Sequence, residues 1–225
     1  MDNVTNLKWL YLDFNSYFAT IEQQVKPDLR NRPVAIVPSL TDYTCAIAAS
    51  YDAKRLGIKT GTMIYEAKKK CPELICIQAD HEKYIYYHHK LIREINKYIP
   101  VEQVCSIDEV ACRLIGRECN PKIVVHKAIA IKQGIKKNVG DYISCSIGIS
   151  SNKFLAKTAS NLQKPNGLKI ISNHKIEKRL NHLKLSDLTG IGKRMEMKLH
   201  LSGITSVKKL YELSPKYMRK IWGNV

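Results

Sequence analysis

The sequence predicts an α+β fold, and three observations lead to this prediction. Residues 7–172 alternate between short apolar runs typical of strands and longer runs with helical spacing. Residues 1–24 and about 85–172 follow the order strand, helix, strand, strand, helix, strand, which is the order of ferredoxin-like sheets. After Ser172 the pattern changes to short, basic, helical pieces, so we expect a helical lobe over 173–225.

A strand and a helix are expected at the start of the chain. The run LKWLYLDF, residues 7–14, is apolar almost throughout and predicts a buried strand that ends near Asp13. Residues 15–24 are expected to form a helix. The polar stretch that follows, 26–33, contains prolines and predicts a loop.

An insert at about 25–84 is expected to form a small lobe of its own. Its apolar runs and turn residues predict strands at 33–37 and 44–49 around a turn near 40–42, a helix near 51–56, a loop at Gly57 and Gly61, a helix that ends at Lys70, and a strand at 74–78. The sequence therefore predicts a small α/β unit that interrupts the ferredoxin-like series.

The rest of that series is expected between 81 and 171. Apolar residues in the run 81–98 recur at close to helical spacing, which predicts a long helix. Pro121 suits the first turn of a helix over 121–137, because the N–H that proline lacks would be unpaired there. The other expected elements are strands at 101–106, 110–114, 142–149 and 168–171 and a helix at 152–162.

Composition and charge restrict the class of protein. No apolar run approaches the roughly 18 residues that a membrane span needs, and the first residues lack the pattern of a secretory signal. The net charge is +17, and residues 151–225 hold 16 Lys and Arg against four Asp and Glu. This excess predicts a polyanionic partner, most simply nucleic acid, with a generic basic surface as the alternative.

The seven cysteines predict reduced thiols. They form no CxxC pair, their number is odd, and some, such as Cys105 and Cys145, lie in apolar runs. A zinc site or a disulfide framework is therefore not expected, and a cytosolic protein fits best.

Three carboxylates are candidates for a metal site. Asp13 ends an apolar strand, and Asp108 and Glu109 lie between two others. In the ferredoxin-like order the first strand can lie beside that hairpin, so the carboxylates would meet at one edge of the sheet and need cations to neutralise them. Hard oxygen ligands select Mg²⁺ or Mn²⁺. The alternatives are a helix N-cap for Asp13 and ordinary turn residues for the other two.

Five segments resemble the Y-family translesion DNA polymerases. They are LDFNSYFATIEQ (12–23), AASYDAKRLGIKTG (48–61), CSIDEVACRL (105–114), SIGISSNKFLAKTASNLQKPNGLKII (146–171) and LTGIGKRMEMKLHLSGI (188–204). They occur in the family's order and at its spacing, and the resemblance covers nearly the whole chain. The DF, SIDE and KPNG elements make it specific.

The resemblance implies a right-hand polymerase fold. A ferredoxin-like palm would comprise 1–24 and 85–172, small α/β fingers 25–84, and a helical thumb 173–225. The implied activity is template-directed, low-fidelity DNA synthesis from deoxynucleoside triphosphates, without proofreading. Family members continue into a little-finger domain and often a clamp-binding peptide, so we expect a truncated catalytic core with poor DNA affinity and processivity.

The resemblance also assigns the site residues. By the family's pattern, Asp13, Asp108 and Glu109 are catalytic and hold two Mg²⁺ ions, which Mn²⁺ can replace, with help from the Phe14 backbone carbonyl. The primer 3′-hydroxyl would be activated at one ion, and the triphosphate would be held by the other, with pyrophosphate leaving in line.

Five further residues match nucleotide-contacting positions of the family: Tyr17, Phe18, Tyr51, Lys54 and Lys164. Phe18 would be the steric gate that blocks a ribose 2′-hydroxyl. Lys54 replaces the usual arginine, and Ala48 replaces a frequent hydroxyl residue, so weaker or altered triphosphate binding is expected. Without the resemblance, the aromatic residues could be core residues and the lysines solvated charges.

The segment after Leu188 resembles a helix-hairpin-helix element. Gly190, Ile191, Gly192 and Lys193 would bring backbone amides to a DNA phosphate without reading bases, although a plain turn is the alternative. Thr189 replaces a frequent proline. DNA binding by this basic segment should be independent of sequence and should fall steeply with salt.

Two rivals to the polymerase reading remain open. One is a catalytically idle DNA-binding relative, which the three carboxylates argue against. The other is a different palm-fold enzyme such as a nucleotide cyclase, whose glycine-rich acidic hairpin is not found. For the polymerase we expect primer–template DNA and nucleotides as partners, a sliding clamp only through a further C-terminal region, no membrane, a monomer, and a cytoplasmic location, nucleoid-associated in a bacterium.

Overall fold

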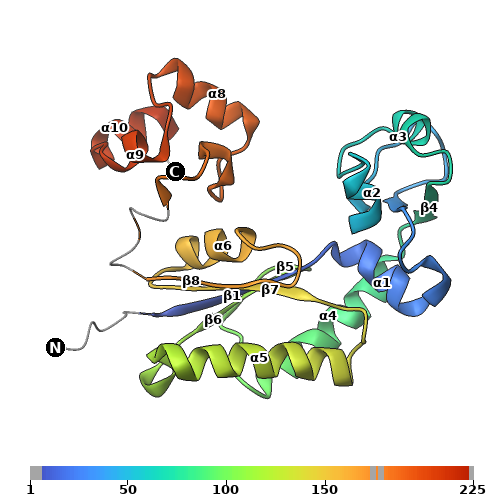
Figure 1. The fold of residues 1–225 in the computed structure, drawn as a ribbon, viewed down its shortest axis with the longest axis horizontal. Coiled ribbons are helices and arrows are strands. Elements are labelled where there is room, and N and C mark those ends of the chain that lie inside the picture. The colour runs from blue at the N-terminus through green and yellow to red at the C-terminus, as the bar shows by residue number, and fades with distance from the viewer. Residues whose placement is uncertain (1–6, 173–175, 177–179, 223–225) are drawn as a thin grey trace.

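A computed structural model describes residues 7–172, 176 and 180–222 of the chain (Figure 1). The strands are β1 (Trp9–Phe14), β2 (Val34–Val37), β3 (Ala48–Ala49), β4 (Ile75–Gln78), β5 (Gln103–Ser106), β6 (Glu109–Arg113), β7 (Cys145–Ser150) and β8 (Leu168–Ile171). The helices are α1 (Tyr17–Val25), α2 (Tyr51–Arg55), α3 (Ile64–Lys70), α4 (His81–Asn96), α5 (Pro121–Asn138), α6 (Lys153–Asn161), α8 (Lys193–Leu201), α9 (Val207–Tyr211) and α10 (Pro215–Trp222).

The elements expected from the sequence are present, and the α+β prediction is confirmed. The largest difference is the strand expected at 44–49, which is reduced to Ala48–Ala49 with an isolated bridge between Cys45 and Met63. Three short 3₁₀ turns, at Pro27–Leu29, Gly116–Cys119 and Leu185–Asp187, were not expected. Residues 223–225, at the end of the expected thumb, lie outside the described residues.

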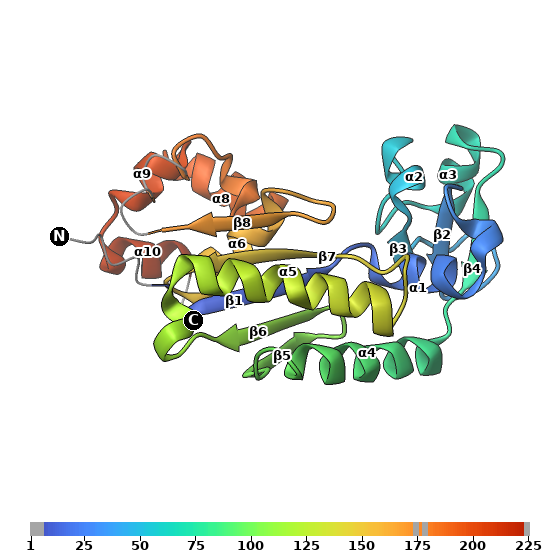
Figure 2. The same ribbon diagram turned by 60° about the horizontal axis from the view of Figure 1, so that its bottom comes forward.

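The main sheet has five strands in the order β5-β6-β1-β7-β8. Strand β1 lies in the centre and is antiparallel to both neighbours, β6 and β7, whereas β8 runs parallel to β7. Figures 1 and 2 show α4 and α5 on one face of this sheet and α6 on the other. The first four strands have the ferredoxin-like arrangement, in which the first strand lies beside the hairpin.

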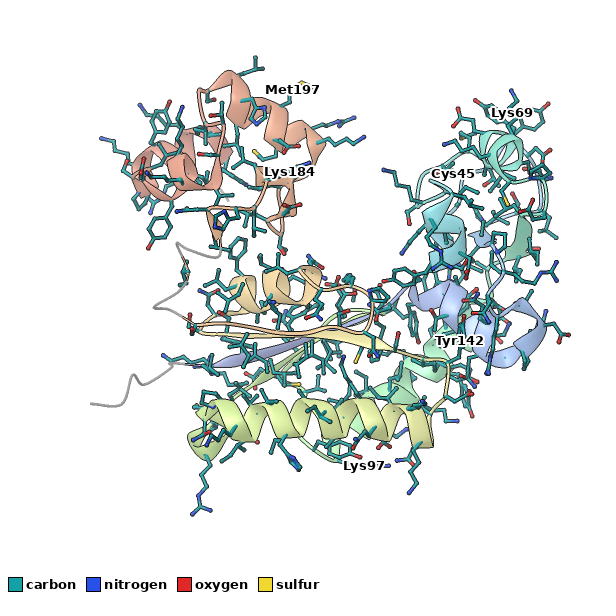
Figure 3. The ribbon with its side chains drawn as sticks, in the orientation of Figure 1. Cys45, Lys69, Lys97, Tyr142, Lys184 and Met197 are labelled. Atoms are coloured by element: carbon teal, nitrogen blue, oxygen red, sulfur yellow. The ribbon has the colours of Figure 1, made fainter. Side chains whose placement is uncertain are left out.

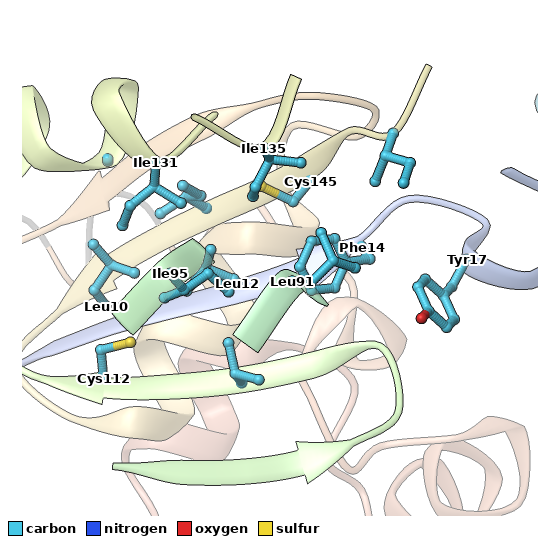
Figure 4. Close-up of a cluster of buried hydrophobic side chains, with 14 of the residues drawn as sticks. Leu10, Leu12, Phe14, Tyr17, Leu91, Ile95, Cys112, Ile131, Ile135 and Cys145 are labelled. Atoms are coloured by element: carbon cyan, nitrogen blue, oxygen red, sulfur yellow. The ribbon is translucent and has the colours of Figure 1, made fainter. Parts of the chain in front are cut away.

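Strand β1 presents two different faces. Leu10, Leu12 and Phe14 point to the face covered by α4 and α5, where they pack in the main hydrophobic cluster (Figure 4). Side chains alternate along a strand, so Tyr11 and Asp13 point to the face under α6. Tyr11 accordingly packs with Ala111 and Ala156 in a separate small cluster. The only acidic residue of β1 therefore lies on the α6 face.

A glycine lets α6 approach this face closely. Gly148 of β7 is paired with Tyr11. A Cβ atom on Gly148 would lie 1.9 Å from the Ala156 carbonyl oxygen and 2.3 Å from the Ser160 backbone nitrogen. No side chain fits in that space, so glycine at this position allows the helix to rest directly on the strand.

The insert and the C-terminal helices form two further units. The insert has a sheet in the order β3-β2-β4 and its own cluster around Ala35, Ala49 and Ile64. The C-terminal helices pack with Leu155 and Ala159 of α6 in another cluster. Both units rise from the α6 face at opposite ends of the molecule, as the labels Lys69 and Met197 indicate in Figure 3. Among the described residues, no helix is both long and apolar enough to span a membrane.

All seven cysteines are free thiols. Cys145 and Cys112 are buried in the main cluster, and burial raises the pKa of each thiol to about 12. Both thiols are therefore protonated at neutral pH and pack as small apolar side chains.

Candidate active site

The structure brings the three predicted carboxylates to one edge of the main sheet. Asp13 lies directly opposite Glu109 in the β1–β6 pairing, and the Phe14 backbone N–H donates to the Asp108 carbonyl at 2.9 Å. The N-cap of α1 is Ser16, so the alternative role of Asp13 as a helix cap is wrong. Asp108 lies in the turn between β5 and β6, which agrees with the alternative interpretation of it as a turn residue.

The side chains of these carboxylates are engaged with basic and hydroxyl groups. Asp13, which is 4% exposed, accepts hydrogen bonds from Lys157 and, at 2.6 Å, from Lys164. Glu109 accepts from the Tyr11 hydroxyl at 2.6 Å and from Lys157 at 2.5 Å. In these side-chain conformations, no three His, Cys, Asp or Glu side chains of the described residues are gathered as metal ligands.

 Burial raises the pKa of the Asp108 carboxyl. The hydrogen bond from Ser106 (2.6 Å) opposes that effect, and the nearby charges of Asp13 and Glu109 raise the pKa further. The net pKa of Asp108 is above its ordinary value. Burial is the main cause, and the charges of Asp13 and Glu109 add the repulsion expected for adjacent carboxylates.

This group of residues fits divalent cations. All of the side-chain donors are carboxylate oxygens, which Mg²⁺ and Mn²⁺ prefer. Two ammonium groups, from Lys157 and Lys164, already lie against Asp13, so the site stabilises positive charge at this position.

A cavity of about 310 Å³ opens beside the carboxylates. It lies between β1, the start of α1, the β5–β6 turn, α6 and the insert. The residues that line it are Asp13, Phe14, Ser16, Tyr17, Phe18, Ile47, Ala48, Ala49, Lys54, Thr60, Ile107, Asp108, Glu109, Lys157 and Lys164. Most of the predicted site residues therefore share one cavity.

The two aromatic residues of α1 are fixed by Tyr84 of α4. The Phe18 ring stacks on the Tyr84 ring, with 4.4 Å between centroids and 17° between planes. The buried Tyr17 donates its hydroxyl to the Tyr84 backbone carbonyl at 2.7 Å. Both residues line the cavity, but the Tyr17 hydroxyl is already used within the protein.

The predicted phosphate-binding residues come from two units. Lys54 of α2 donates to the Ser16 hydroxyl at 2.7 Å, and its ammonium lies 4.9 Å from the centre of the Tyr51 ring. Burial and the charge of Lys164 lower the pKa of Lys54. Tyr51 does not line the cavity itself, although burial and the charge of Asp13 raise the pKa of its hydroxyl.

A polar network holds the loop that carries Lys164. The Asn15 side-chain oxygen accepts from the Asn166 backbone N–H at 2.8 Å, and its amide donates to the Ser146 hydroxyl at 3.0 Å. Lys132 of α5 donates to the backbone carbonyls of Asn166 (2.6 Å) and Gly167 (2.8 Å). This network joins the end of β1 to the Lys164 loop and positions the Lys164 ammonium at Asp13.

The sequence analysis missed Lys157, Tyr11 and this network. Lys157 lies between the buried residues Ala156 and Thr158 of α6, and a lysine among small, buried neighbours was the available signal. Asn15 and Lys132 gave no signal, since their partners are backbone and side-chain groups from distant segments that only the folded chain brings near.

The predicted DNA-binding segment forms the start of α8. Gly190 has φ +85°, a conformation that favours glycine, and Gly192 is the N-cap of α8. Ile191 is buried, whereas Lys193 is exposed in the first turn. The Thr189 hydroxyl, at the frequent proline position, is buried without a hydrogen-bond partner among the described residues.

Comparison with known proteins identifies relatives of this chain. The model of the impB/mucB/samB family matches residues 12–161. A protein named DNA polymerase IV from Moorella thermoacetica is 34% identical over 218 residues, which are 96% of this chain and 54% of that protein. The protein of the same name from Streptococcus agalactiae is 32% identical over 94% of this chain and 58% of its own length. The chain spans about half the length of these curated relatives.

Solved structures of similar fold agree with the sequence matches. The crystal structure of DinB from Sulfolobus solfataricus has a TM-score of 0.84 and 26% identity, over 96% of this chain and 63% of that one. The insertion ternary complex of Dbh DNA polymerase has a TM-score of 0.86 and 27% identity, over 96% of this chain and 64% of that one. The fold and the order of the motifs therefore agree.

Proposed function

Because the chain belongs to the impB/mucB/samB family, the Y-family resemblance seen in the sequence is confirmed, and from this premise we propose that the chain is the catalytic core of a translesion DNA polymerase. It would extend a primer 3′ end along a template with deoxynucleotides, at low fidelity and without proofreading. The relatives named DNA polymerase IV and the similarity to Dbh DNA polymerase support this proposal.

The observation that carries the proposal is the pairing of Asp13 with Glu109 beside Asp108. We propose that these three carboxylates and the Phe14 backbone carbonyl hold two Mg²⁺ ions, which Mn²⁺ can replace. When bound, such ions neutralise phosphate charge and favour the deprotonated primer hydroxyl. The sheet register places the backbones of Asp13 and Glu109 opposite each other before any substrate binds.

The residues around the cavity would position the nucleotide. Lys54 of the insert and Lys164 of the loop after α6 would supply positive charge for a triphosphate, with Tyr51 beside Lys54. Phe18, which Tyr84 holds in place, would face the sugar and exclude a ribose 2′-hydroxyl. Tyr17 would line the pocket through its ring.

We propose a division of labour among the three units. The main sheet (1–24 and 85–172) would be the palm, the insert (25–84) the fingers, and 173–225 the thumb. In the thumb, the segment Gly190–Lys193 would contact a DNA phosphate at the start of α8. The relatives named DNA polymerase IV are bacterial, so we propose that the chain acts on DNA in the cytoplasm, at the nucleoid. We also propose that it is a monomer and that it meets a sliding clamp through a region beyond these residues.

A primer-extension assay tests the proposal. The full chain, with Mg²⁺, all four deoxynucleotides and a labelled primer on undamaged and damaged templates, should extend the primer. Asp108→Ala should lower the rate about a thousandfold or more, because it removes one carboxylate of the ion site. Asp42→Ala is a matched control, since Asp42 is exposed and pairs with Lys68 in the insert.

The outcomes separate polymerase from binding module. DNA binding without extension by the wild-type chain, or equal extension by wild type and Asp108→Ala, would contradict the polymerase proposal. The first result would instead favour a catalytically idle DNA-binding relative.

A further inference from the structure

Lys157 lies between two of the proposed metal-binding carboxylates. Its helix, α6, rests on the sheet face to which Asp13 points, and the Lys157 side chain is 11% exposed. Its ammonium donates to Asp13 Oδ2 and, at 2.5 Å, to Glu109 Oε1. One ammonium thus bridges the pair of carboxylates that the β1–β6 register brings together.

Lys157 differs in this respect from the other lysine at the site. Lys164 also donates to Asp13 Oδ2, at 2.6 Å, but its side chain is 32% exposed and it has no ion pair with Glu109. Lys157 is therefore the more buried of the two lysines and the one that contacts both carboxylates.

A divalent ion held by Asp13 and Glu109 would bind the same two carboxylate groups that accept from Lys157, and the ammonium already occupies one oxygen of each. A dication and an ammonium at the same carboxylates also repel each other. The ion and the Lys157 ammonium must therefore compete. The ring of Tyr11, whose centre lies 5.2 Å from the Lys157 ammonium, offers the displaced charge a neighbouring aromatic face.

We propose that Lys157 is an internal competitor that lowers the affinity of the Asp13–Glu109 pair for divalent ions. The inference rests on the proposed function, because it concerns the ion site assigned there. Its consequence is that the carboxylates alone hold an ion weakly, and tight binding requires further oxygen ligands such as those of a triphosphate. Lys157 would in this way link ion binding to nucleotide binding.

Mn²⁺ binding to the full chain, without DNA or nucleotide, tests the proposal. Binding is followed by electron paramagnetic resonance of free Mn²⁺ for the wild type and for Lys157→Met, which keeps an unbranched chain and removes the charge. We expect about tenfold tighter binding by Lys157→Met, the usual effect of one adjacent charge on such a group.

Two control variants separate competition from general charge effects. Lys153→Met removes the same charge from the same helix, one turn away. Lys153 donates to the Gln103 side chain and not to the carboxylates of the site, so this variant should bind Mn²⁺ within twofold of wild type. Lys157→Arg keeps the charge and should also stay close to wild type. Equal or weaker Mn²⁺ binding by Lys157→Met, or tightening by all three variants alike, would overturn the proposal.

Thermal unfolding provides a second readout that does not depend on activity. In chelator, Lys157→Met should unfold at a lower temperature than wild type, because the carboxylates lose a counter-charge. Added Mn²⁺ should raise its Tm by more than it raises that of wild type, since tighter binding stabilises more. An equal Mn²⁺-induced shift in both would count against competition.

A last variant distinguishes failure of this inference from failure of the ion site itself. Asp13→Asn should abolish the Mn²⁺ binding that wild type shows. If Mn²⁺ binding persists in Asp13→Asn, the ion lies elsewhere and the proposed metal site is wrong. If Asp13→Asn abolishes binding and Lys157→Met leaves it unchanged, the site stands and only the role of Lys157 is wrong.

Discussion

Consecutive residues at the end of β1 serve different parts of the site. Asp13 points to the α6 face and its lysines, while Phe14 packs in the main cluster. Asn15 fastens the Lys164 loop, and Ser16, at φ +48°, turns the chain into α1 and accepts from Lys54. Each of these four consecutive residues therefore has a specific contact in the folded chain.

The proposed steric gate gives a prediction at this scale. Phe18→Ala removes the ring that stacks on Tyr84, so the space beside the sugar opens. Ribonucleotide incorporation relative to deoxynucleotide incorporation should rise by about a hundredfold or more, because a clash with the 2′-hydroxyl is relieved. Single-nucleotide insertion kinetics with both nucleotide types measure this ratio.

A matched aromatic variant serves as the control for that prediction. Tyr86→Ala removes an exposed ring from α4 that does not line the cavity, and it should leave the ratio unchanged. An unchanged ratio in Phe18→Ala would remove the gate assignment.

At the scale of elements, the site depends on how closely α6 approaches the sheet. The small residues Gly148, Ala156 and Ala159 let the helix lie directly on β7. Lys157 can then reach Asp13 and Glu109 from above the strand pair. The close packing of helix and strand thus sets the position of a charged group near the carboxylates.

Gly148→Ala tests the importance of this approach. The added Cβ would lie 1.9 Å from a backbone oxygen, which cannot move as a side chain can. We expect a loss of about 3 kcal/mol of folding free energy, or a Tm lower by roughly 6–12 °C for a chain of this size. Thermal unfolding followed by circular dichroism measures the change.

Gly192→Ala is the control, because a Cβ there would meet nothing within 4 Å and φ is negative. Its cost should stay within about 1 kcal/mol, as for other residues at a helix N-cap. Equal Tm values for Gly148→Ala and wild type would mean that α6 can shift away without loss.

The sequence was more informative about elements than about side-chain partners. Periodicity and turn residues located the strands and helices because each pattern is local. The pairing of Asp13 with Glu109 followed from the ferredoxin-like order, and family motifs assigned the cavity residues. Lys157, Asn15 and Lys132 could not be found in the same way, because their contacts join segments far apart in sequence and depend on the exact approach of α5, α6 and the Lys164 loop.

At the scale of the whole molecule, charge and shape act together. The insert and the C-terminal helices rise at opposite ends of the α6 face, and the cavity lies on that same side. Residues 151–225 carry most of the positive excess of a chain whose net charge is +17. This arrangement suits a polyanion that lies across the sheet and meets backbone amides at the start of α8.

Salt dependence gives the prediction at this scale. Primer–template binding, measured by fluorescence anisotropy, should weaken by about a hundredfold between roughly 50 and 200 mM salt, because released counterions drive the association. Two unrelated DNA sequences should bind equally well. Lys193→Ala should reduce the slope of log K against log salt by about 1.

Lys122→Ala is the control, since Lys122 is an exposed lysine of α5, on the opposite face of the sheet. It should leave the slope unchanged. Binding that is insensitive to salt, or that depends strongly on DNA sequence, would contradict the proposed mode of contact.

The two faces of β1 have a consequence for errors in assembly. A slip of one residue in that strand would push Asp13 among Leu91 and Ile95 and would turn Leu12 to the α6 face. Burying an unpaired carboxylate in that apolar layer is too costly for the slipped form to persist. A molecule that has folded at all therefore has its acidic residues correctly aligned. Mutations that disturb this alignment should be seen first as a lower yield of folded protein.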